Sequence, residues 1–132
     1  MPDDPLREGL EFLDRDGYLE VRARGAYTLD RMIRQLDAAV EGCRKRKLDR
    51  LLFDIVDVQG YRPSTAERFQ IGAHIAGLIR SFSRFACLAT RDQIDPENFT
   101  SRVASNRGQP APVFNDRGQA LAWILGQAPP RA

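Results

Sequence analysis

The segment Leu51-Leu52-Phe53-Asp54-Ile55-Val56-Asp57-Val58 fixes the architecture expected of this 132-residue chain. It is short and mostly apolar, the basic residues 44–47 precede it, and Gly60 and Pro63 follow it. This pattern is typical of a strand that is buried on both faces in the middle of an α/β sheet. Because open α/β sheets bind ligands beyond the carboxyl ends of such strands, a site is expected near the loop after Val58.

Two strands and a helix are expected before this segment. Residues 10–13 and 18–24 flank a turn that contains Asp-Gly, which is a strong signal for a β-hairpin. Residues 29–43 then carry apolar side chains along one face of an amphipathic helix, with Thr28 as its N-cap. The basic residues 44–47 suit the negative C-terminal end of this helix, and a patch for an anionic partner is the alternative.

Helices alternate with strands after the central segment. Ser64-Thr65-Ala66-Glu67 matches a capping box and begins a second helix, and residues 84–90 predict the next buried strand. Asp95 and Pro96 are expected to begin a third helix as its N-cap and first residue, and Gly108 to end it. The remaining expected elements are an edge strand at residues 111–114, marked by Pro112, and a last helix from Asn115 or Asp116 to Gly126.

The resulting order, β-β-α-β-α-β-α-β-α, predicts an α/β fold. We expect a mixed five-stranded sheet, antiparallel at the N-terminal hairpin and mainly parallel elsewhere, with about four helices on its two faces. Residues 1–132 are expected to form a single domain, with a core at about 8–126 and loose termini at 1–7 and 127–132.

The charge of the chain is balanced. Twenty basic residues face eighteen acidic ones, and both signs are spread along the sequence. Nucleic-acid binders concentrate positive charge on a patch or stripe, so no nucleic-acid partner is expected. The chain carries no signal peptide and no apolar run of the length that a membrane span needs. We therefore expect a cytoplasmic protein with reduced cysteines.

No metal site or cofactor is expected. His74 is the only histidine, and no second ligand lies at metal-binding spacing from it. Cys43 and Cys87 lie on a helix face and in a buried strand, so both are interpreted as small core residues. The glycine-rich phosphate-binding motifs and the nucleophile elbow are absent from the sequence. The chain is therefore not expected to be an enzyme.

Asp54 and Asp57 are the best candidates for a carboxylate pair. Residues three apart on a strand point to opposite faces, which argues against a shared acid/base role. Asp57 is expected to accept a hydrogen bond from a loop or helix amide. Asp54 needs a partner if it is buried, and Arg24 or Arg84 on a neighbouring strand could provide one.

The C-terminal part of the chain resembles that of bacterial SpoIIAA-like proteins, which have the STAS-type fold. The resemblance rests on the helix and Asn-Arg-Gly at residues 99–108, on Val113-Phe114-Asn115-Asp116, and on Ala120-Leu121-Ala122-Trp123-Ile124. It extends over roughly residues 8–126. It implies a small domain without catalytic chemistry that binds partner proteins or small ligands, and the broader fold is shared with lipid-binding CRAL-TRIO domains.

The resemblance also implies where a regulatory serine would lie. Anti-sigma-factor antagonists of this fold carry an Asp-Ser-Ser-Gly type motif after the central strand, and its serine is phosphorylated. The corresponding residues 58–65 read differently here, although Ser64 occupies the matching helix start. Ser64 and Thr65 are therefore regulatory candidates, with an N-cap as the alternative role of Ser64.

An apolar cleft is expected at the carboxyl end of the central strand. The second helix carries small residues, including Gly72 and Gly77, which suggest close packing against the sheet or a ligand. The candidate ligand-binding residues are Tyr61, Arg62, Phe69, Ile75 and Phe99. The leading hypothesis is a non-catalytic module that holds a small amphipathic or fatty-acid-like ligand or touches a membrane surface. A regulatory protein–protein module and an enzyme of unknown reaction are the alternatives, and an oligomer is possible.

Overall fold

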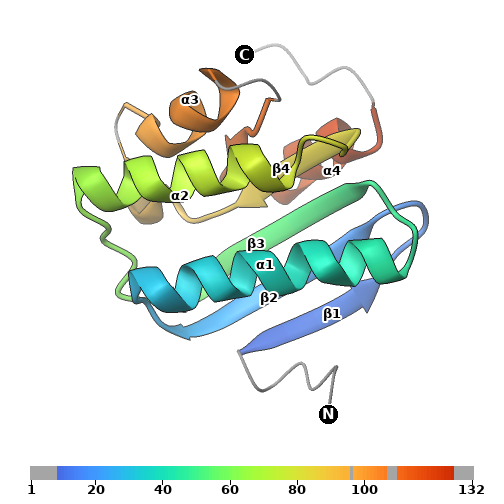
Figure 1. Ribbon diagram of the computed structural model, residues 1–132, viewed down its shortest axis with the longest axis horizontal. Coiled ribbons are helices and arrows are strands. Elements are labelled where there is room, and N and C mark those ends of the chain that lie inside the picture. The colour runs from blue at the N-terminus through green and yellow to red at the C-terminus, as the bar shows by residue number, and fades with distance from the viewer. Residues whose placement is uncertain (1–8, 96, 107–109, 127–132) are drawn as a thin grey trace.

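The computed structural model describes residues 9–95, 97–106 and 110–126, and it confirms the α/β fold (Figure 1). A mixed sheet has the strand order β1-β2-β3-β4-β5, with β1 and β2 antiparallel and the other pairs parallel. The elements in chain order are β1 (Leu10–Asp14), β2 (Leu19–Ala26), α1 (Leu29–Lys45), β3 (Arg50–Gln59), α2 (Thr65–Leu78), β4 (Arg84–Leu88), a 3₁₀ turn (Arg91–Gln93), α3 (Phe99–Asn106), β5 (Val113–Phe114) and α4 (Arg117–Ile124).

The hairpin of β1 and β2 forms at the edge of the sheet, as predicted. Gly17 has a φ of 87° in the connecting turn, a conformation that glycine adopts without the steric cost that a side chain would bring. Leu19, Val21 and Ala23 alternate along β2 and are all buried in the main core. The alternating pattern of the sequence therefore predicted the correct inward face.

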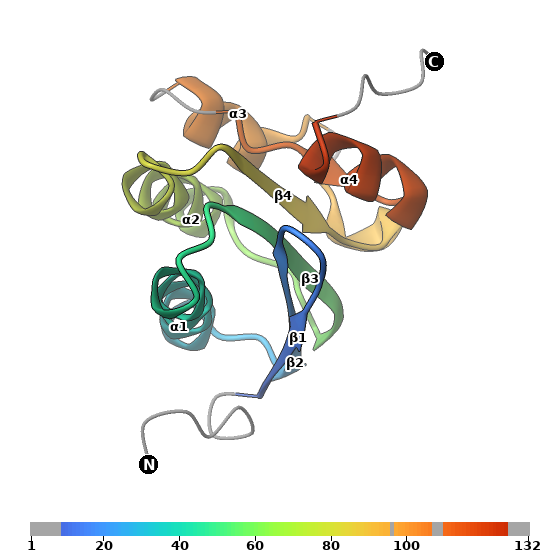
Figure 2. The same cartoon turned by 90° about the vertical axis from the view of Figure 1, so that its right-hand side faces the viewer.

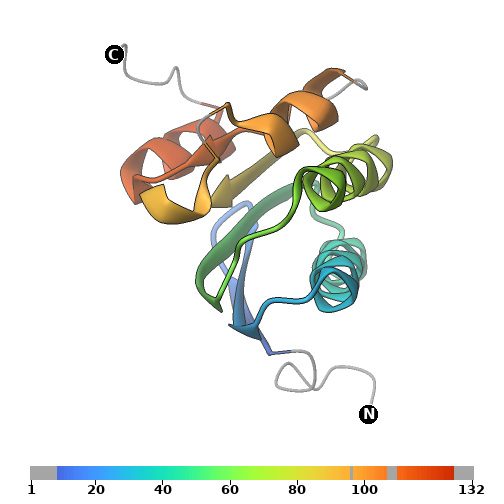
Figure 3. The same cartoon turned by 90° about the vertical axis from the view of Figure 1, so that its left-hand side faces the viewer.

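The helices cover the two faces of the sheet unequally, and the order of the strands explains why. Strands β2 to β5 are parallel and adjacent in chain order, and crossovers between such strands are almost always right-handed. They therefore place α1, α2 and α3 on the same side. Among the described helices, only α4, which follows the last strand, covers the other side (Figures 2 and 3).

The central strand β3 contributes to a core on each face. Leu51, Phe53 and Ile55 are buried in the larger core beneath α1 and α2. Leu52 points to the opposite face, where it packs with Ile124 and other apolar residues beneath α4. This confirms the central position predicted for residues 51–58, but coverage on both faces holds only for residues 51–55, because Val56 and Asp57 near the carboxyl end are exposed. The edge position predicted for β5 is also confirmed.

The predicted start of the third helix is wrong. The helix α3 begins at Phe99, and Asn98 before it has a φ of 53°, a left-handed conformation that interrupts a helix. Asp95 is not the N-cap, because it lies four residues before the start of the helix, and its carboxylate forms an ion pair with Arg68 of α2. The predicted roles of Pro96 and Gly108 lie outside the described residues.

The small residues of α2 have two different environments. A Cβ atom on Gly72 would lie 2.6 Å from the carbonyl oxygen of Thr100 and 2.9 Å from Cβ of Val103, so α3 packs directly on the backbone of α2. A Cβ atom on Gly77 would meet no described atom within 4 Å. The packing role suggested by the sequence therefore holds for Gly72 and not for Gly77.

We predict opposite effects for alanine at these two glycines. Gly72→Ala should lower the free energy of unfolding by about 1–3 kcal/mol, because the methyl group forces α3 away from α2. Gly77→Ala is the matched control and should raise the free energy of unfolding by about 0.4–1 kcal/mol, because alanine restricts the unfolded chain. Urea unfolding of both variants measures the difference, and equal effects would contradict the close packing.

Candidate functional site

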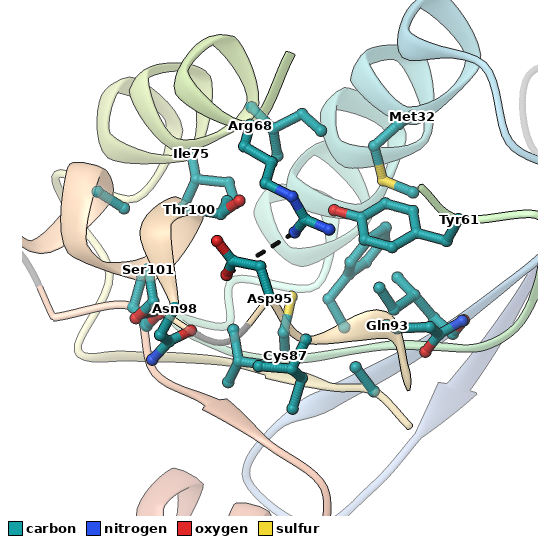
Figure 4. A pocket seen from close by; sticks show the side chains of 18 of the residues that line it. Met32, Tyr61, Arg68, Ile75, Cys87, Gln93, Asp95, Asn98, Thr100 and Ser101 are labelled. Carbon is teal, nitrogen blue, oxygen red and sulfur yellow. Dashed lines mark hydrogen bonds and ion pairs between the residues drawn. The ribbon is translucent and has the colours of Figure 1, made fainter. Parts of the chain in front are cut away.

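A pocket of about 40 Å³ lies near the carboxyl ends of β3 and β4, between α2 and α3 (Figure 4). Its lining is mostly apolar. Phe53 and Ile55 of β3 and Cys87 of β4 contribute from the sheet, and Ile71 and Ile75 contribute from α2. The position agrees with the general rule that parallel α/β sheets bind ligands at the carboxyl ends of their strands.

The helical period of α2 determines which of its residues reach the pocket. Arg68, Ile71 and Ile75 lie at i, i+3 and i+7, so they share one face, and all three line the pocket. Phe69 lies about 100° farther round the helix, and 45% of it is exposed. The face of α2 that carries Arg68 is therefore the one that lines the pocket.

The predicted site residues are only partly brought together. Tyr61 and Ile75 line the pocket. Arg62 and Phe69 are exposed and are not among the lining residues, so the expectation that they border the cleft is corrected. Arg62 is exposed between the buried residues Tyr61 and Pro63. The side chain of Phe99 lies outside the part of the chain that the structure describes.

Tyr61 is held at the pocket by two neighbours. Its ring meets that of Tyr27 edge-on, with 5.0 Å between the ring centroids, and the guanidinium carbon of Arg68 lies 5.7 Å from its centroid. Burial raises the pKa of Tyr61, so the phenol is neutral at physiological pH. Tyr61 therefore offers an apolar ring and a neutral hydroxyl, and it orients Arg68 through a cation–π contact.

Three of the polar residues that line the pocket come from different segments and lie close together (Figure 4). Arg68 comes from α2, Asp95 from the loop before α3, and Thr100 from the first turn of α3. The Arg68 Nη1 and Asp95 Oδ1 atoms are 3.9 Å apart. The hydroxyl of Thr100 is buried and has no hydrogen-bond partner in the described part of the chain. We did not predict any of these three as site residues, although the helical spacing from Ile71 and Ile75 would have identified Arg68.

Two buried side chains fix the walls of the pocket. The amide nitrogen of Gln93 donates to the carbonyl oxygens of Ile55 at 2.8 Å and Val58 at 3.2 Å. The hydroxyl of Ser101 donates to the carbonyl oxygen of Ala111 at 2.6 Å. These bonds tie the loop before α3, and α3 itself, to neighbouring segments. The pocket is therefore preformed.

Ser64 is the N-cap of α2, as the capping-box motif predicted. Its hydroxyl accepts from the Glu67 amide, and its amide donates to the Glu67 carboxylate, both at 3.1 Å. The same carboxylate accepts the hydroxyl of Tyr27 at 3.2 Å. Ser64 and Thr65 are both exposed, and a regulatory role for either stays a prediction.

Asp54 belongs to a second polar cluster, on the sheet face that carries α4. Its expected partners Arg24 and Arg84 are replaced by Arg22, whose Nε lies 3.8 Å from an Asp54 oxygen, because Arg22 is directly opposite Asp54 in the register of β2 and β3. Burial raises the pKa of Asp54, partly offset by a hydrogen bond from the Val56 amide and by Arg22.

Glu20 is the centre of this second cluster. It is fully buried, and its carboxylate pairs with Arg15 at 3.1 Å, with Arg22 at 3.2 Å and with Arg117. Burial alone would raise the pKa of Glu20, but the three guanidinium groups outweigh it and lower the pKa. Because its carboxylate is saturated with donors, Glu20 is a structural ion pair and not a proton donor.

The described residues provide no basis for metal or thiol chemistry. They contain no group of three or more His, Cys, Asp or Glu side chains that could hold a metal ion. Burial raises the pKa of Cys43 and of Cys87 to about 12, so both are neutral thiols in the core. His74 pairs with Asp37 at 2.7 Å and joins α2 to α1. Among the described helices, none has the length and apolar character to cross a membrane.

Comparison with known proteins gives no match. No protein-family model, no curated protein and no solved structure matches this chain. The resemblance to SpoIIAA-like proteins therefore stays a prediction that rests on the C-terminal residues and on the order of the elements. The function has to be inferred from the pocket itself.

We predict that the Ser64 cap contributes measurably to stability. Ser64→Ala should lower the free energy of unfolding by about 0.5–2 kcal/mol, because the Glu67 amide loses its acceptor. Thr65→Ala, at the neighbouring exposed position, should change it by no more than about 0.5 kcal/mol. Thermal unfolding of both variants tests this, and a larger effect of Thr65→Ala would refute the assignment of the cap.

Glu20 should make stability depend on pH. Its pKa is lower in the folded than in the unfolded protein, so ionised Glu20 stabilises the fold above the ordinary glutamate value of about 4.3. This contribution is lost as the pH falls through the folded pKa. Glu20→Gln should therefore reduce the free energy of unfolding by about 1.5–3 kcal/mol at pH 7, and by progressively less below about pH 4.

Denaturant unfolding between pH 3 and pH 7 measures this dependence. The matched control is Glu41→Gln, which removes an exposed carboxylate 3.7 Å from Arg44 on α1. It should change the free energy of unfolding by less than about 1 kcal/mol at each pH. A Glu20→Gln effect that is independent of pH would contradict the role given to the ion pairs.

Proposed function

We propose that this protein is a non-catalytic binding module for a small amphipathic molecule, as expected for a SpoIIAA-like or STAS-like domain. The observation that carries the proposal is a preformed, mostly apolar pocket in which Arg68, Asp95 and Thr100 provide a cluster of polar groups. Ligand sites commonly combine a mainly apolar lining with a few polar groups that fix orientation. A cytoplasmic location, as expected from the sequence, agrees with this role.

The volume of the pocket limits the size of the ligand. A water molecule needs roughly 10–15 Å³ of such space, so a pocket of about 40 Å³ has room for about three water-sized groups. This corresponds to an apolar tail of about three or four carbons. A long fatty-acid chain would need α2 and α3 to separate, which the close packing at Gly72 opposes. The geometry therefore favours a short-chain molecule over a lipid or a membrane surface.

The regulatory alternative has weaker support. Ser64 is exposed and open to modification, but its hydroxyl already accepts the Glu67 amide, and the Glu67 carboxylate lies beside it. A phosphate on Ser64 would have the favourable end of the helix dipole but also the repulsion of that carboxylate. We therefore keep a partner-protein role as a second hypothesis.

A series of straight-chain alcohols from ethanol to octanol tests the proposal without any contribution from ligand charge. We expect saturable shifts of the amide resonances of Thr100 and Ala104 in two-dimensional NMR. The affinity should rise about fourfold for each methylene that fits, since burial of a methylene contributes about 0.8 kcal/mol, and should stop rising at about four carbons.

A pocket-filling variant and its control complete this test. Ala104 is buried and lines the pocket, so Ala104→Leu should abolish alcohol binding. The same change at the exposed Ala66 of α2 should leave binding unchanged. Absence of saturable binding in the wild type, or equal binding by Ala104→Leu, would favour the partner-protein hypothesis.

A further inference from the structure

We infer that the ligand of this pocket is a short-chain organic anion, such as a carboxylate, whose charged group binds Arg68 in place of Asp95. This inference rests on the proposed function and adds the charge and the orientation of the ligand. The apolar tail would lie against Ile71, Ile75 and Phe53, which line the same pocket.

The state of Arg68 is the first observation that supports an anion. Its side chain is only 14% exposed, and its guanidinium carries five N–H donors. Within the described part of the chain the guanidinium makes no hydrogen bond, and its contacts are the Tyr61 ring and the Asp95 carboxylate. A charged group that is mostly withdrawn from water and lacks hydrogen bonds favours a ligand that supplies acceptors.

The distance to Asp95 is the second observation. A guanidinium and a carboxylate in direct hydrogen-bond contact lie about 2.7–2.9 Å apart, whereas Arg68 and Asp95 are separated by 3.9 Å. Asp95 therefore neutralises Arg68 without satisfying its donors.

The surroundings of Arg68 and Asp95 also favour a negatively charged ligand. The buried Thr100 hydroxyl has no partner in the described residues and can donate to an anionic oxygen. Thr100 and Ser101, in the first turn of α3, line the pocket, so the positive end of this helix faces the bound group. Figure 4 shows Arg68, Thr100 and Asp95 gathered at one end of the pocket.

Three probes of equal chain length separate charge from shape. Butanoate, 1-butanol and butylammonium are titrated into the full chain at constant ionic strength, and Kd is measured from amide shifts. We expect butanoate to bind about tenfold more tightly than 1-butanol, and butylammonium to bind least. Tighter binding of butylammonium, or equal binding of butanoate and 1-butanol, would overturn the inference while the proposed function stands.

Substitutions of Arg68 and Asp95 should change the affinity for butanoate in opposite directions. Arg68→Gln should weaken butanoate binding about tenfold and leave 1-butanol binding within about twofold, which also shows that the pocket is intact. Asp95→Asn should strengthen butanoate binding severalfold, because a competing carboxylate is removed. The matched control is Arg62→Gln, which removes an exposed arginine outside the pocket and should change the Kd of neither butanoate nor 1-butanol.

The outcomes distinguish failure of the proposed function from failure of the charged site alone. If none of the three probes binds, the proposed function fails. The charged site alone fails if 1-butanol binds but Asp95→Asn weakens the binding of butanoate. It also fails if Arg62→Gln weakens butanoate binding as much as Arg68→Gln does. Thr100→Val should weaken the binding of butanoate and of 1-butanol alike, because an oxygen of either ligand can accept a hydrogen bond from the Thr100 hydroxyl. An unchanged Kd for both ligands would show that Thr100 is not part of the site.

Discussion

Burial of β3 on both faces of the sheet is the constraint on which the rest of the structure depends. Its backbone pairs with β2 on one side and β4 on the other, so its two rows of side chains need covers from other elements. Phe53 is covered by the layer of α1 and α2, and Leu52 by α4. Because the parallel crossovers place their helices on one side, the chain needs a helix after its last strand to cover the other side.

The pocket exists because its walls are fixed by contacts that do not depend on its contents. Gly72 lets α3 lie against the backbone of α2, while Gln93 and Ser101 attach the neighbouring segments to carbonyl groups of the sheet and of the strand connection. Aliphatic side chains of α2 then meet β3 without filling all the space between them. The same contacts that preform the pocket also restrict it to short ligands.

Two arginine–carboxylate systems in this protein differ in a way that separates structure from function. Glu20 is surrounded by three guanidinium groups, two of them at 3.1–3.2 Å, so its acceptors are satisfied and the cluster stabilises the fold. Arg68 has one carboxylate at 3.9 Å, and its guanidinium makes no hydrogen bond in the described part of the chain. An ion pair whose hydrogen-bonding groups are all satisfied has none left for a ligand. An arginine at a pocket with unsatisfied donors can bind a ligand in place of its carboxylate partner.

Local signals in the sequence were sufficient for the order of the elements, for the Asp-Gly hairpin, for the Ser64 cap and for the central place of residues 51–58. Each depends on periodicity or on hydrogen bonds within a few residues, which a sequence displays directly. The start of α3 and the polar end of the pocket required the folded chain. Arg68 and Asp95 are far apart in sequence, and their ion pair forms only when α2 packs beside the loop before α3. Helical spacing tells which face a residue occupies, but the element that covers that face, and hence the site, is set by tertiary packing.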